Sequence, residues 1–382
     1  ENDDANARRL AATALQSGVD GDWTVQANWT AGLAAWRQND YRTAAPYFAQ
    51  VAGKGNNADM RAAGAYWAAR AYMNSGEPQR VESLLRIAAQ TGDTFYGMLS
   101  RETLGMPTNE NAAPDGFSDA DWSQLRSSPN VKVAMALADI GQIALADETL
   151  RYQAKVGGQA QYQSLLHLAA ALDLPATELW LAHNGPAGVQ PAKYARFPAP
   201  NWTPDGGWRV DPALIFAHTL QESGFRTDAV SSAGARGLMQ VRPGTAGDVA
   251  SGTVTLAQLS TPSTNMEYGQ RYLEQLSTMS ATGGLLPKVM AAYNAGPVPV
   301  ERWNTEVRDG GDPLLFMESL PYYETRAYVN IVMRNYWVYQ MKEGRNSDAL
   351  MGMAQGKWPR FPRATSRQPV RLSSSGFTAG AD

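Results

Sequence analysis

Residues 211–240 read DPALIFAHTLQESGFRTDAVSSAGARGLMQ, and this stretch decides the fold of the second half of the chain. Asp211 followed by Pro212 predicts a helix start, because the first side chain caps a free backbone N–H and proline suits the first helical position. The predicted helix is apolar and ends at Gly224, with Glu222 in its last turn. The helix dipole and apolar surroundings both raise the pKa of a carboxyl group placed there. Glu222 is therefore a candidate general acid, and the alternative is a surface glutamate at a fraying helix end.

Small and polar residues follow this helix and flank a tight turn. Glycines at such a turn allow the backbone to approach a ligand closely. Gln240 follows three apolar residues, where exposure to solvent is not expected, so we expect its amide to have a role. His218 lies one helical turn before Glu222 and either bonds to this acid or, as we favour, is a packed core histidine.

Residues 289–297 read VMAAYNAGP and predict an apolar helix that ends at Gly296. Tyr293 and Asn294 lie in its last turn.

Residues 321–339 read PYYETRAYVNIVMRNYWVY and predict another helix. Glu324 and Tyr328 share one face of it, because residues four apart are neighbours on a helix. Tyr336 and Tyr339 continue at helical spacing and are interpreted as core residues.

The first half of the chain is rich in Ala and poor in β-branched residues, which favours helices. The pattern around Trp36 and Asp40 recurs 36 residues later around Tyr72 and Gly76, and a looser third copy spans residues 138–150. Each copy is an apolar helix, a polar turn and a second apolar helix. This period is typical of helical-pair solenoids, and the alternative is an irregular helical bundle.

Composition shifts divide the chain into regions. We expect an α-superhelical domain at residues 1–190 with a sub-boundary near 107–119, a Pro- and Gly-rich linker at 191–209, and a second helical domain at 210–345. Residues 346–382 form a basic tail containing Pro and Ser, which is expected to make no core and to be extended or disordered. Such a tail either contacts an anionic polymer or, as we favour, is simply solvated.

The composition excludes several classes of protein. The chain has 382 residues, of which 44% are hydrophobic and 18% charged, with a net charge of −3, three His and no Cys. These values exclude a disordered chain, a collagen and a disulfide scaffold. No apolar run is long enough to span a membrane, and a near-zero net charge argues against nucleic acid as a partner. With so few His and no Cys, we expect no metal site and no cofactor.

Several motifs together resemble one enzyme family. In order, they are ESGF at 222–225, AVS at 229–231, GARGLMQ at 234–240, PGTA at 243–246, N…G…YL at 265–273, AYNAGP at 292–297 and LPYYETRAYV at 320–329. Their order and spacing resemble the lytic transglycosylases of bacterial cell-wall turnover, and among these the soluble family with a helical N-terminal superhelix. The first half resembles that family only loosely, through its repeat and FYG at 95–97.

The resemblance implies an all-α protein, with an N-terminal helical-pair superhelix followed by a lysozyme-like, α-rich catalytic domain. It also implies that Glu222 protonates the glycosidic oxygen between N-acetylmuramic acid and N-acetylglucosamine. Glu222 then acts as a base on the C6 hydroxyl, which closes on C1 to give a 1,6-anhydro end. One carboxylate suffices, because the substrate's own acetamido group stabilises the positive centre, unlike the usual two-carboxylate scheme.

The resemblance further implies a set of substrate-binding residues: Ser231, Gln240, Tyr293, Asn294, Glu324 and Tyr328. Ser231 would orient the muramoyl acetamido group, and Glu324 would be a polar anchor beside the acid. Alternatively, Glu324 pairs with Arg326 or Arg334 and is purely structural. Arg242 stands where the family commonly has Met, which puts the sugar preference of one subsite in doubt. Flat apolar faces also bind sugars, and the candidates for them are Trp202, Trp208, Trp303 and Tyr322.

Two other functions stay open at this point. A hydrolase of the same fold would need a second carboxylate to activate water, and Asp228, Asp248 and Glu267 lie near the motifs. A scaffold would use the helical repeats to bind a partner and would not need Glu222 together with Ser231. The implied partner is the glycan strand of peptidoglycan, with cell-envelope proteins as further partners of the N-terminal helices. The implied location is the periplasm, with a signal peptide already removed from a mature chain that has no lipid-anchor cysteine.

Overall fold

The computed structural model describes residues 3–18, 21–107, 116–189, 193–250 and 253–364. In this part of the chain the regular structure consists of α-helices and short 3₁₀ turns, and β-pairing is limited to isolated bridges. The all-α prediction is therefore confirmed.

The chain divides into two compact units, which are described separately. Unit 1 comprises residues 1–110, 275–337 and 346–361, and unit 2 comprises residues 111–274, 338–345 and 362–382. Both units take residues from before and after the expected linker at 191–209. The domain limits drawn from the sequence therefore stay a prediction.

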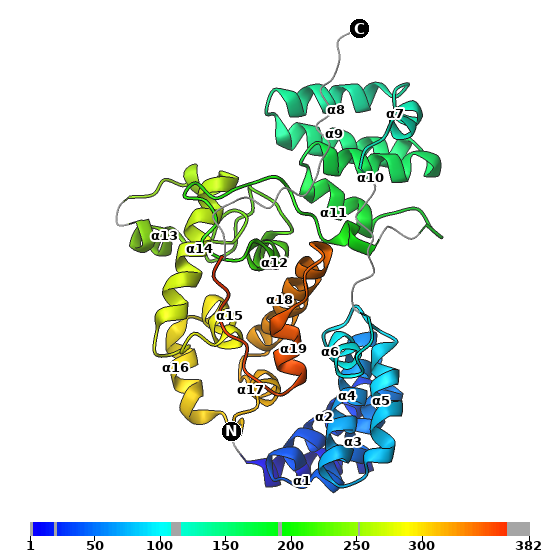
Figure 1. The fold of residues 1–382 in the computed structure, drawn as a ribbon, viewed down its shortest axis with the longest axis vertical. Helices are drawn as coiled ribbons and strands as arrows, with labels where there is room; N and C mark the ends of the chain where they lie inside the picture. The colour runs from blue at the N-terminus through cyan, green and yellow to red at the C-terminus, as the bar shows by residue number, and fades with distance from the viewer. Residues whose placement is uncertain (1–2, 19–20, 108–115, 190–192, 251–252, 365–382) are drawn as a thin grey trace. The chain divides into compact units, whose positions relative to one another are not determined.

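Unit 1 combines an N-terminal helical array with helices from the second half of the chain (Figure 1). The array consists of α1 (Asp4–Gln16), α2 (Asp22–Arg37), α3 (Tyr41–Lys54), α4 (Ala58–Asn74), α5 (Val81–Ala89) and α6 (Phe95–Thr103), with a 3₁₀ turn at Pro78–Arg80. The later helices are α15 (Leu286–Ala295), α16 (Pro297–Glu306), α17 (Pro313–Ser319), α19 (Asp348–Ala354) and most of α18 (Tyr323–Lys342).

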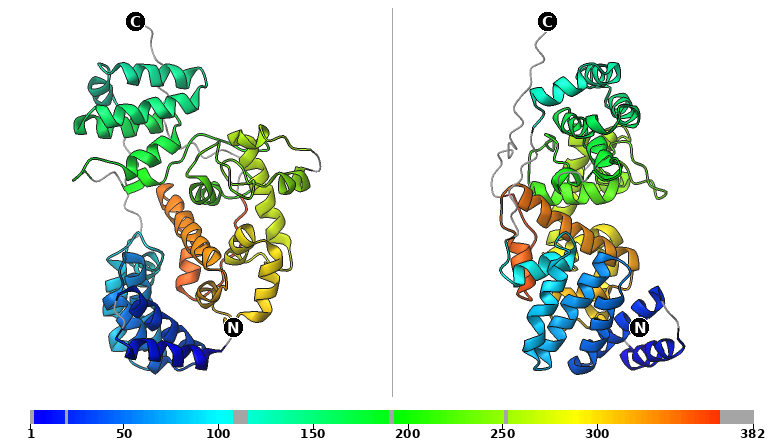
Figure 2. Two further views of the ribbon diagram at one scale, coloured as in Figure 1. Left: turned by 180° about the vertical axis from the view of Figure 1, so that it is seen from behind. Right: turned by 90° about the vertical axis from the view of Figure 1, so that its right-hand side faces the viewer.

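The N-terminal array is built from helical pairs, as the repeat predicted. Helices α2 and α3 form one pair and α4 and α5 the next, and successive helices pack side by side (Figures 1 and 2). Asn39 and Gly76 take positive φ angles of 58° and 84° in the two turns. The N–H groups of Asp40 and Glu77 then close the turns on carbonyls five residues back. The third predicted copy is also a helical pair and has Gly141 in the same conformation, with φ 74°.

Aromatic rings fill the interior of the array. Trp67 is fully buried, with the ring centroids of Trp36 at 5.0 Å and Phe48 at 5.6 Å. Gly64 lets α4 approach α3 closely, since a Cβ atom there would lie 2.4 Å from the backbone N of Ala52. A glycine at position 64 is therefore needed for α3 and α4 to pack this closely.

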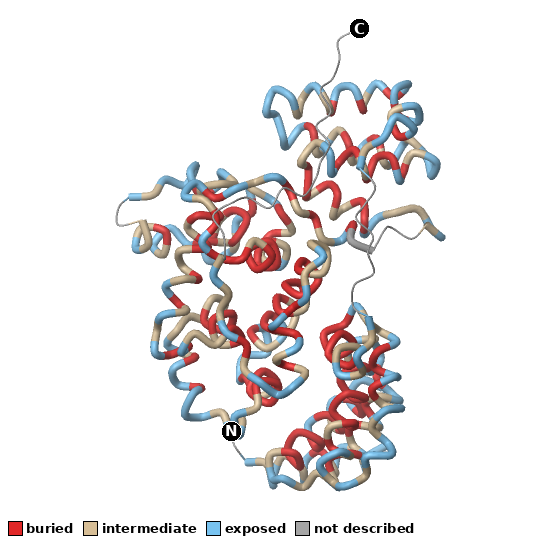
Figure 3. Tube along the Cα trace, in the orientation of Figure 1, coloured by how far each residue is buried: buried red, intermediate tan, exposed pale blue. Residues whose placement is uncertain are grey.

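Unit 2 begins with a second helical group and continues into the segment quoted first. Its helices are α7 (Asp119–Leu125), α8 (Pro129–Asp139), α9 (Ile143–Val156), α10 (Tyr162–Ala171), α11 (Pro175–His183), α12 (Pro212–Ser223), α13 (Pro243–Ala250) and most of α14 (Pro262–Thr278). Its 3₁₀ turns are Gln159–Gln161, Lys193–Arg196 and Gln258–Ser260. Helix α12 is buried along nearly its whole length (Figure 3).

The expectation that the tail makes no core is wrong for residues 346–364. Helix α19 lies in this stretch, and its Leu350 and Met353 are buried. The chain after it forms an isolated bridge between Leu285 and Arg360 in unit 1. The few apolar residues just before the basic run were enough to anchor a helix. Residues 365–382, with the rest of the basic tail, lie outside the described residues.

Candidate active site

Helix α12 holds the candidate acid, and both of its ends form as predicted. The Asp211 side chain accepts a hydrogen bond from the backbone N of Ala213 at 3.1 Å. It also forms an ion pair with Arg345 at 2.8 Å. At the other end Gly224 is left-handed, with φ 58°, and Phe225 follows with φ 65°. The helix therefore ends directly after the turn that carries Glu222.

Helix α12, which carries Glu222, is mostly apolar and buried. Glu222 itself is partly buried, and His218, one turn earlier, is fully buried. Burial lowers the pKa of His218 to about 3, so this histidine is neutral in the folded protein. Its environment is that of a packed core histidine. The elevated pKa of Glu222 stays a prediction.

The turn after α12 is held by the side chains of two predicted site residues. The Oγ atom of Ser231 accepts a hydrogen bond from the backbone N of Ala235 at 3.0 Å. The Nε2 atom of Gln240 donates to the carbonyls of Ala229 at 3.2 Å and Gly237 at 2.9 Å. The amide of Gln240 thus has a role inside the protein, since its N–H groups fix the shape of this turn.

Asn265 of α14 anchors the same turn, and its role was not predicted. Its Oδ1 atom accepts from the backbone N of Met239 at 2.8 Å, and its Nδ2 atom donates to the carbonyl of Leu259 at 2.7 Å. Gly237 allows this contact, because a Cβ atom there would lie 2.2 Å from the Leu259 oxygen. Asn265 begins the N…G…YL motif, so the signal was present in the sequence without a function attached.

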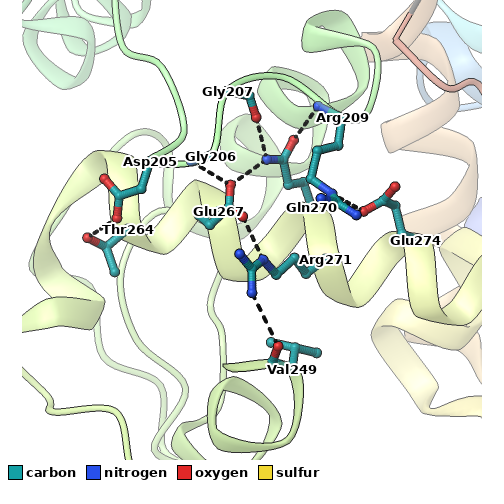
Figure 4. Close-up of polar contacts among 10 residues, drawn as sticks. All are labelled: Asp205, Gly206, Gly207, Arg209, Val249, Thr264, Glu267, Gln270, Arg271 and Glu274. Atoms are coloured by element: carbon teal, nitrogen blue, oxygen red, sulfur yellow. Dashed lines mark hydrogen bonds and ion pairs between the residues drawn. The ribbon is translucent and has the colours of Figure 1, made fainter. Parts of the chain in front are cut away.

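Glu267 of α14 is committed to a structural network (Figure 4). It is only 4% exposed and accepts hydrogen bonds from the backbone N of Gly206 at 3.1 Å and from Arg271 at 2.6 Å. These bonds fasten the segment before α12 to α14. The other two acids considered for activating water, Asp228 and Asp248, are exposed.

A second group of predicted site residues lies in unit 1, where α15 meets α18. Asn294 occupies the last turn of α15, before Gly296, and accepts a hydrogen bond from the Thr325 hydroxyl at 2.6 Å. Tyr293 beside it is partly buried. Glu324 is exposed in the first turn of α18, whereas Tyr328 is only 4% exposed. Tyr336 and Tyr339 are buried, as predicted.

The two arginines proposed as alternative partners of Glu324 bond elsewhere. Arg326 donates to the carbonyl of Leu320 at 2.7 and 3.2 Å, and Arg334 donates to the side chain of Asn335 at 2.9 Å. The side chain of Glu324 is therefore not positioned by the hydrogen bonds of these arginines.

Two of the four aromatic residues proposed as sugar faces are core residues. Trp208 is 6% exposed and Trp303 is fully buried, so neither presents a flat face to a ligand. Trp202 is partly buried, and Tyr322 is 46% exposed with its ring packed edge-on against Trp303 at 5.0 Å. Tyr322 thus remains the better candidate.

The predicted site residues form two groups. Glu222, Ser231 and Gln240 lie in unit 2, and Tyr293, Asn294, Glu324 and Tyr328 lie in unit 1. Among the described residues, no three His, Asp or Glu side chains gather as metal ligands. In the same part of the chain no helix is both long and apolar enough to cross a membrane.

Residues 204–316 match the family model of the transglycosylase SLT domain. A soluble lytic murein transglycosylase of Escherichia coli K12 is 34% identical over 132 residues, which are 33% of this chain and 20% of that protein. The enzyme of the same name from Salmonella typhimurium is 32% identical over 163 residues, 40% of this chain and 24% of that protein. The matched segments thus span only about a quarter or less of these relatives.

Solved structures share the fold of nearly the whole chain. The 70 kDa soluble lytic transglycosylase of Escherichia coli covers 93% of this chain, which spans 59% of it, with a TM-score of 0.68 and 22% identity. A complex of a 70 kDa soluble lytic transglycosylase with bulgecin A gives a TM-score of 0.69 at 22% identity, with coverages of 93% and 59%. An inactive Glu-to-Gln mutant of lytic transglycosylase Slt from Pseudomonas aeruginosa gives a TM-score of 0.59 at 22% identity. The match covers 90% of this chain and 63% of that protein.

Proposed function

Because residues 204–316 match the transglycosylase SLT domain family, we propose that this chain is a lytic transglycosylase of peptidoglycan. The observation that carries this proposal is the content of the matched segment. It includes Glu222 at the end of α12, the turn with Ser231 and Gln240, and the end of α15 with Tyr293 and Asn294. The relatives that match it in sequence are named for cleavage of murein.

In the proposed mechanism Glu222 is the only catalytic carboxylate. It donates its proton to the oxygen between N-acetylmuramic acid and N-acetylglucosamine as that bond breaks, while the acetamido group of the substrate stabilises the cationic C1. The carboxylate then takes the proton of the C6 hydroxyl, whose oxygen bonds to C1. The products are a new N-acetylglucosamine end and a 1,6-anhydro end, with no water consumed. Apolar surroundings keep such an acid protonated near neutral pH.

The remaining site residues bind the sugar chain in this proposal. Ser231 holds the muramoyl acetamido group, and Gln240, Tyr293 and Asn294 contact the sugar rings. Glu324 and Tyr328 contact the glycan strand as further polar anchors. The fold similarity to a structure that contains bulgecin A supports a related ligand here. The substrate places the enzyme in the periplasm, with the glycan strand as its partner.

The hydrolase alternative has lost one of its candidate bases, since Glu267 is buried in a structural network. The inactive Glu-to-Gln mutant of the Pseudomonas enzyme shows that one glutamate is essential in that protein. By analogy, Glu222→Gln removes the proton donor here while keeping the shape of the side chain.

The test is mass spectrometry of the products that the purified chain and its Glu222→Gln variant release from sacculi. We expect muropeptides with 1,6-anhydro ends from the natural chain and none from the variant, with equal thermal unfolding midpoints. Products heavier by one water would identify a hydrolase. The absence of products from both proteins would favour the scaffold hypothesis, and a variant that still cleaves would exclude Glu222 as the acid.

A further inference from the structure

Helix α17 of unit 1 receives side chains from three helices of the N-terminal array. Arg70 of α4 forms an ion pair with Asp312, the N-cap of α17, at 2.6 Å. Arg37 of α2 donates to the Ser319 hydroxyl at 2.7 Å. These pairs join residues 242 and 282 positions apart in the sequence.

The third contact is buried. The Tyr96 hydroxyl of α6 donates to the Glu318 carboxylate at 2.5 Å, and these residues are 5% and 6% exposed. The same carboxylate oxygen faces the Nδ2 atom of Asn330 in α18 at 3.5 Å. Glu318 therefore links the array to both α17 and α18. Burial raises the pKa of Glu318. Because the carboxyl group is buried, the loss of its hydrogen-bond donor is costly.

Arg70 is held rigidly on the array side. Its guanidinium lies 4.8 Å from the ring centroid of Trp36 and 4.6 Å from that of Trp67. Cation–π contacts of this kind restrict a long side chain that would otherwise move freely. The array thus presents a preformed surface to the N-terminal end of α17.

The C-terminal end of α17 leads directly into proposed site residues. Leu320 follows the helix, and its carbonyl accepts two hydrogen bonds from Arg326 in the first turn of α18. That turn also contains Glu324, and Thr325 between them bonds to Asn294 of α15. A displacement of α17 therefore moves the backbone that carries Glu324 and alters the support of Asn294.

We infer that the N-terminal array positions the proposed site residues of unit 1 through α17, with Tyr96 and Glu318 as the central positioning residues. This inference rests on the proposed function, because it assumes that Glu324 and Asn294 bind the substrate during turnover. Tyr96 and Glu318 contact no reacting atom in this scheme. They act by holding α17 where the first turn of α18 needs it.

The test compares Tyr96→Phe with Tyr66→Phe in the full chain. Tyr66 is a buried tyrosine of α4, and its ring centroid lies 5.3 Å from that of Tyr96 within the array. Both variants lose one buried hydroxyl, so their thermal unfolding midpoints should fall by similar amounts. At a temperature where both are folded, Tyr96→Phe should lower kcat on glycan strands by about tenfold or more, whereas Tyr66→Phe should keep the natural kcat.

Two further measurements keep this inference falsifiable. Glu318→Gln, alone and combined with Tyr96→Phe, completes a double-mutant cycle; because both residues act through one bond, the double variant should lose no more kcat than Tyr96→Phe alone. Hydrogen–deuterium exchange of residues 313–326 should rise in Tyr96→Phe and not in Tyr66→Phe. This exchange does not depend on activity, so it tests the array's hold on α17 even if the natural chain releases no products. Natural kcat together with unchanged exchange in Tyr96→Phe would overturn the inference.

Discussion

The hydroxyl of Thr325, in the first turn of α18, donates to the side-chain oxygen of Asn294, in the last turn of α15, at 2.6 Å. Thr325 is 1% exposed, so this bond is shielded from water. It occupies one lone pair of the Asn294 carbonyl and leaves the N–H groups for the proposed contact with a sugar ring. It also ties together the two segments of unit 1 that contain Tyr293, Asn294, Glu324 and Tyr328.

Replacing Thr325 by Val keeps the shape of the side chain and removes this bond. We expect the free energy of unfolding to fall by about 1 kcal/mol, because a buried acceptor loses its donor. The freed Asn294 amide should lower kcat by roughly tenfold. Thr305→Val in α16 is the control, since its exposed hydroxyl bonds only to the Arg302 carbonyl of its own helix. Equal kcat values for the two variants would contradict this role of Thr325.

Gly237→Ala should disrupt the turn that carries Ser231 and Gln240. Its φ is +71°, and the added Cβ would lie 2.2 Å from the Leu259 carbonyl oxygen and 2.4 Å from Asn265. Overpacking against backbone, together with an unfavourable φ, should cost about 3 kcal/mol or more of unfolding free energy.

Gly234→Ala is the matched control for that substitution. Its φ is +79°, but a Cβ atom there meets nothing within 4 Å, so only the backbone term of roughly 1 kcal/mol applies. Chemical denaturation of both variants measures the difference. If the two variants were equally stable, the close approach of Gly237 to α14 would not matter.

Glu267→Ala should destabilise the protein by about 2–4 kcal/mol, since it leaves the Gly206 N–H and the Arg271 guanidinium without their buried acceptor. Glu274→Ala is the control in the same helix. The side chain of its partner Arg209 is 50% exposed, so this surface pair should contribute no more than about 1 kcal/mol. The products released by folded Glu267→Ala should still carry 1,6-anhydro ends, and the loss of these products from a folded variant would mean that Glu267 takes part in turnover.

His218 makes stability depend on pH in a defined direction. Its pKa falls from 6.5 to about 3 on burial, so the unfolded chain binds a proton below pH 6.5 that the folded chain does not. The stabilisation is therefore complete above pH 6.5 and is lost progressively as the pH falls toward 3.

The difference in unfolding free energy between the natural chain and His218→Gln isolates this effect. Between about pH 7.5 and about pH 5.5, the unfolding free energy of the natural chain should fall by about 1.4 kcal/mol relative to that of the variant. Urea denaturation at both values measures it. A difference that stays constant with pH would mean that His218 titrates normally and is not shielded from water.

Much of the local structure was predictable because its determinants lie within a few residues. Asp211 before Pro212 marked the start of α12, and Gly224 and Gly296 marked the ends of α12 and α15. The turn in the repeat around Gly76 was equally visible, since only few residues adopt a positive φ without cost. The family motifs identified Glu222 and its neighbours for the same reason, because they keep fixed spacing along the chain.

Other features depend on partners far away in the sequence. Trp208 and Trp303 seemed able to present flat faces to a sugar, yet both are buried, with rings of later segments, Phe216 and Tyr322, packed against them. Leu350 and Met353 anchor α19 inside a stretch whose composition indicated an extended tail. Periodicity and composition describe one segment at a time, so they do not show which surfaces later segments cover.

By itself, the sequence determined the all-α class, the helical pairs of the first half, the ends of α12 and α15, and Glu222 as the candidate acid. Each of these rests on capping, turn or motif residues close together in the chain. Only the tertiary structure decided that Glu267 fastens a linker and that Tyr96 reaches Glu318 across 222 positions of sequence. The physical reason is that a buried polar group needs a partner, and folding supplies it from any part of the chain.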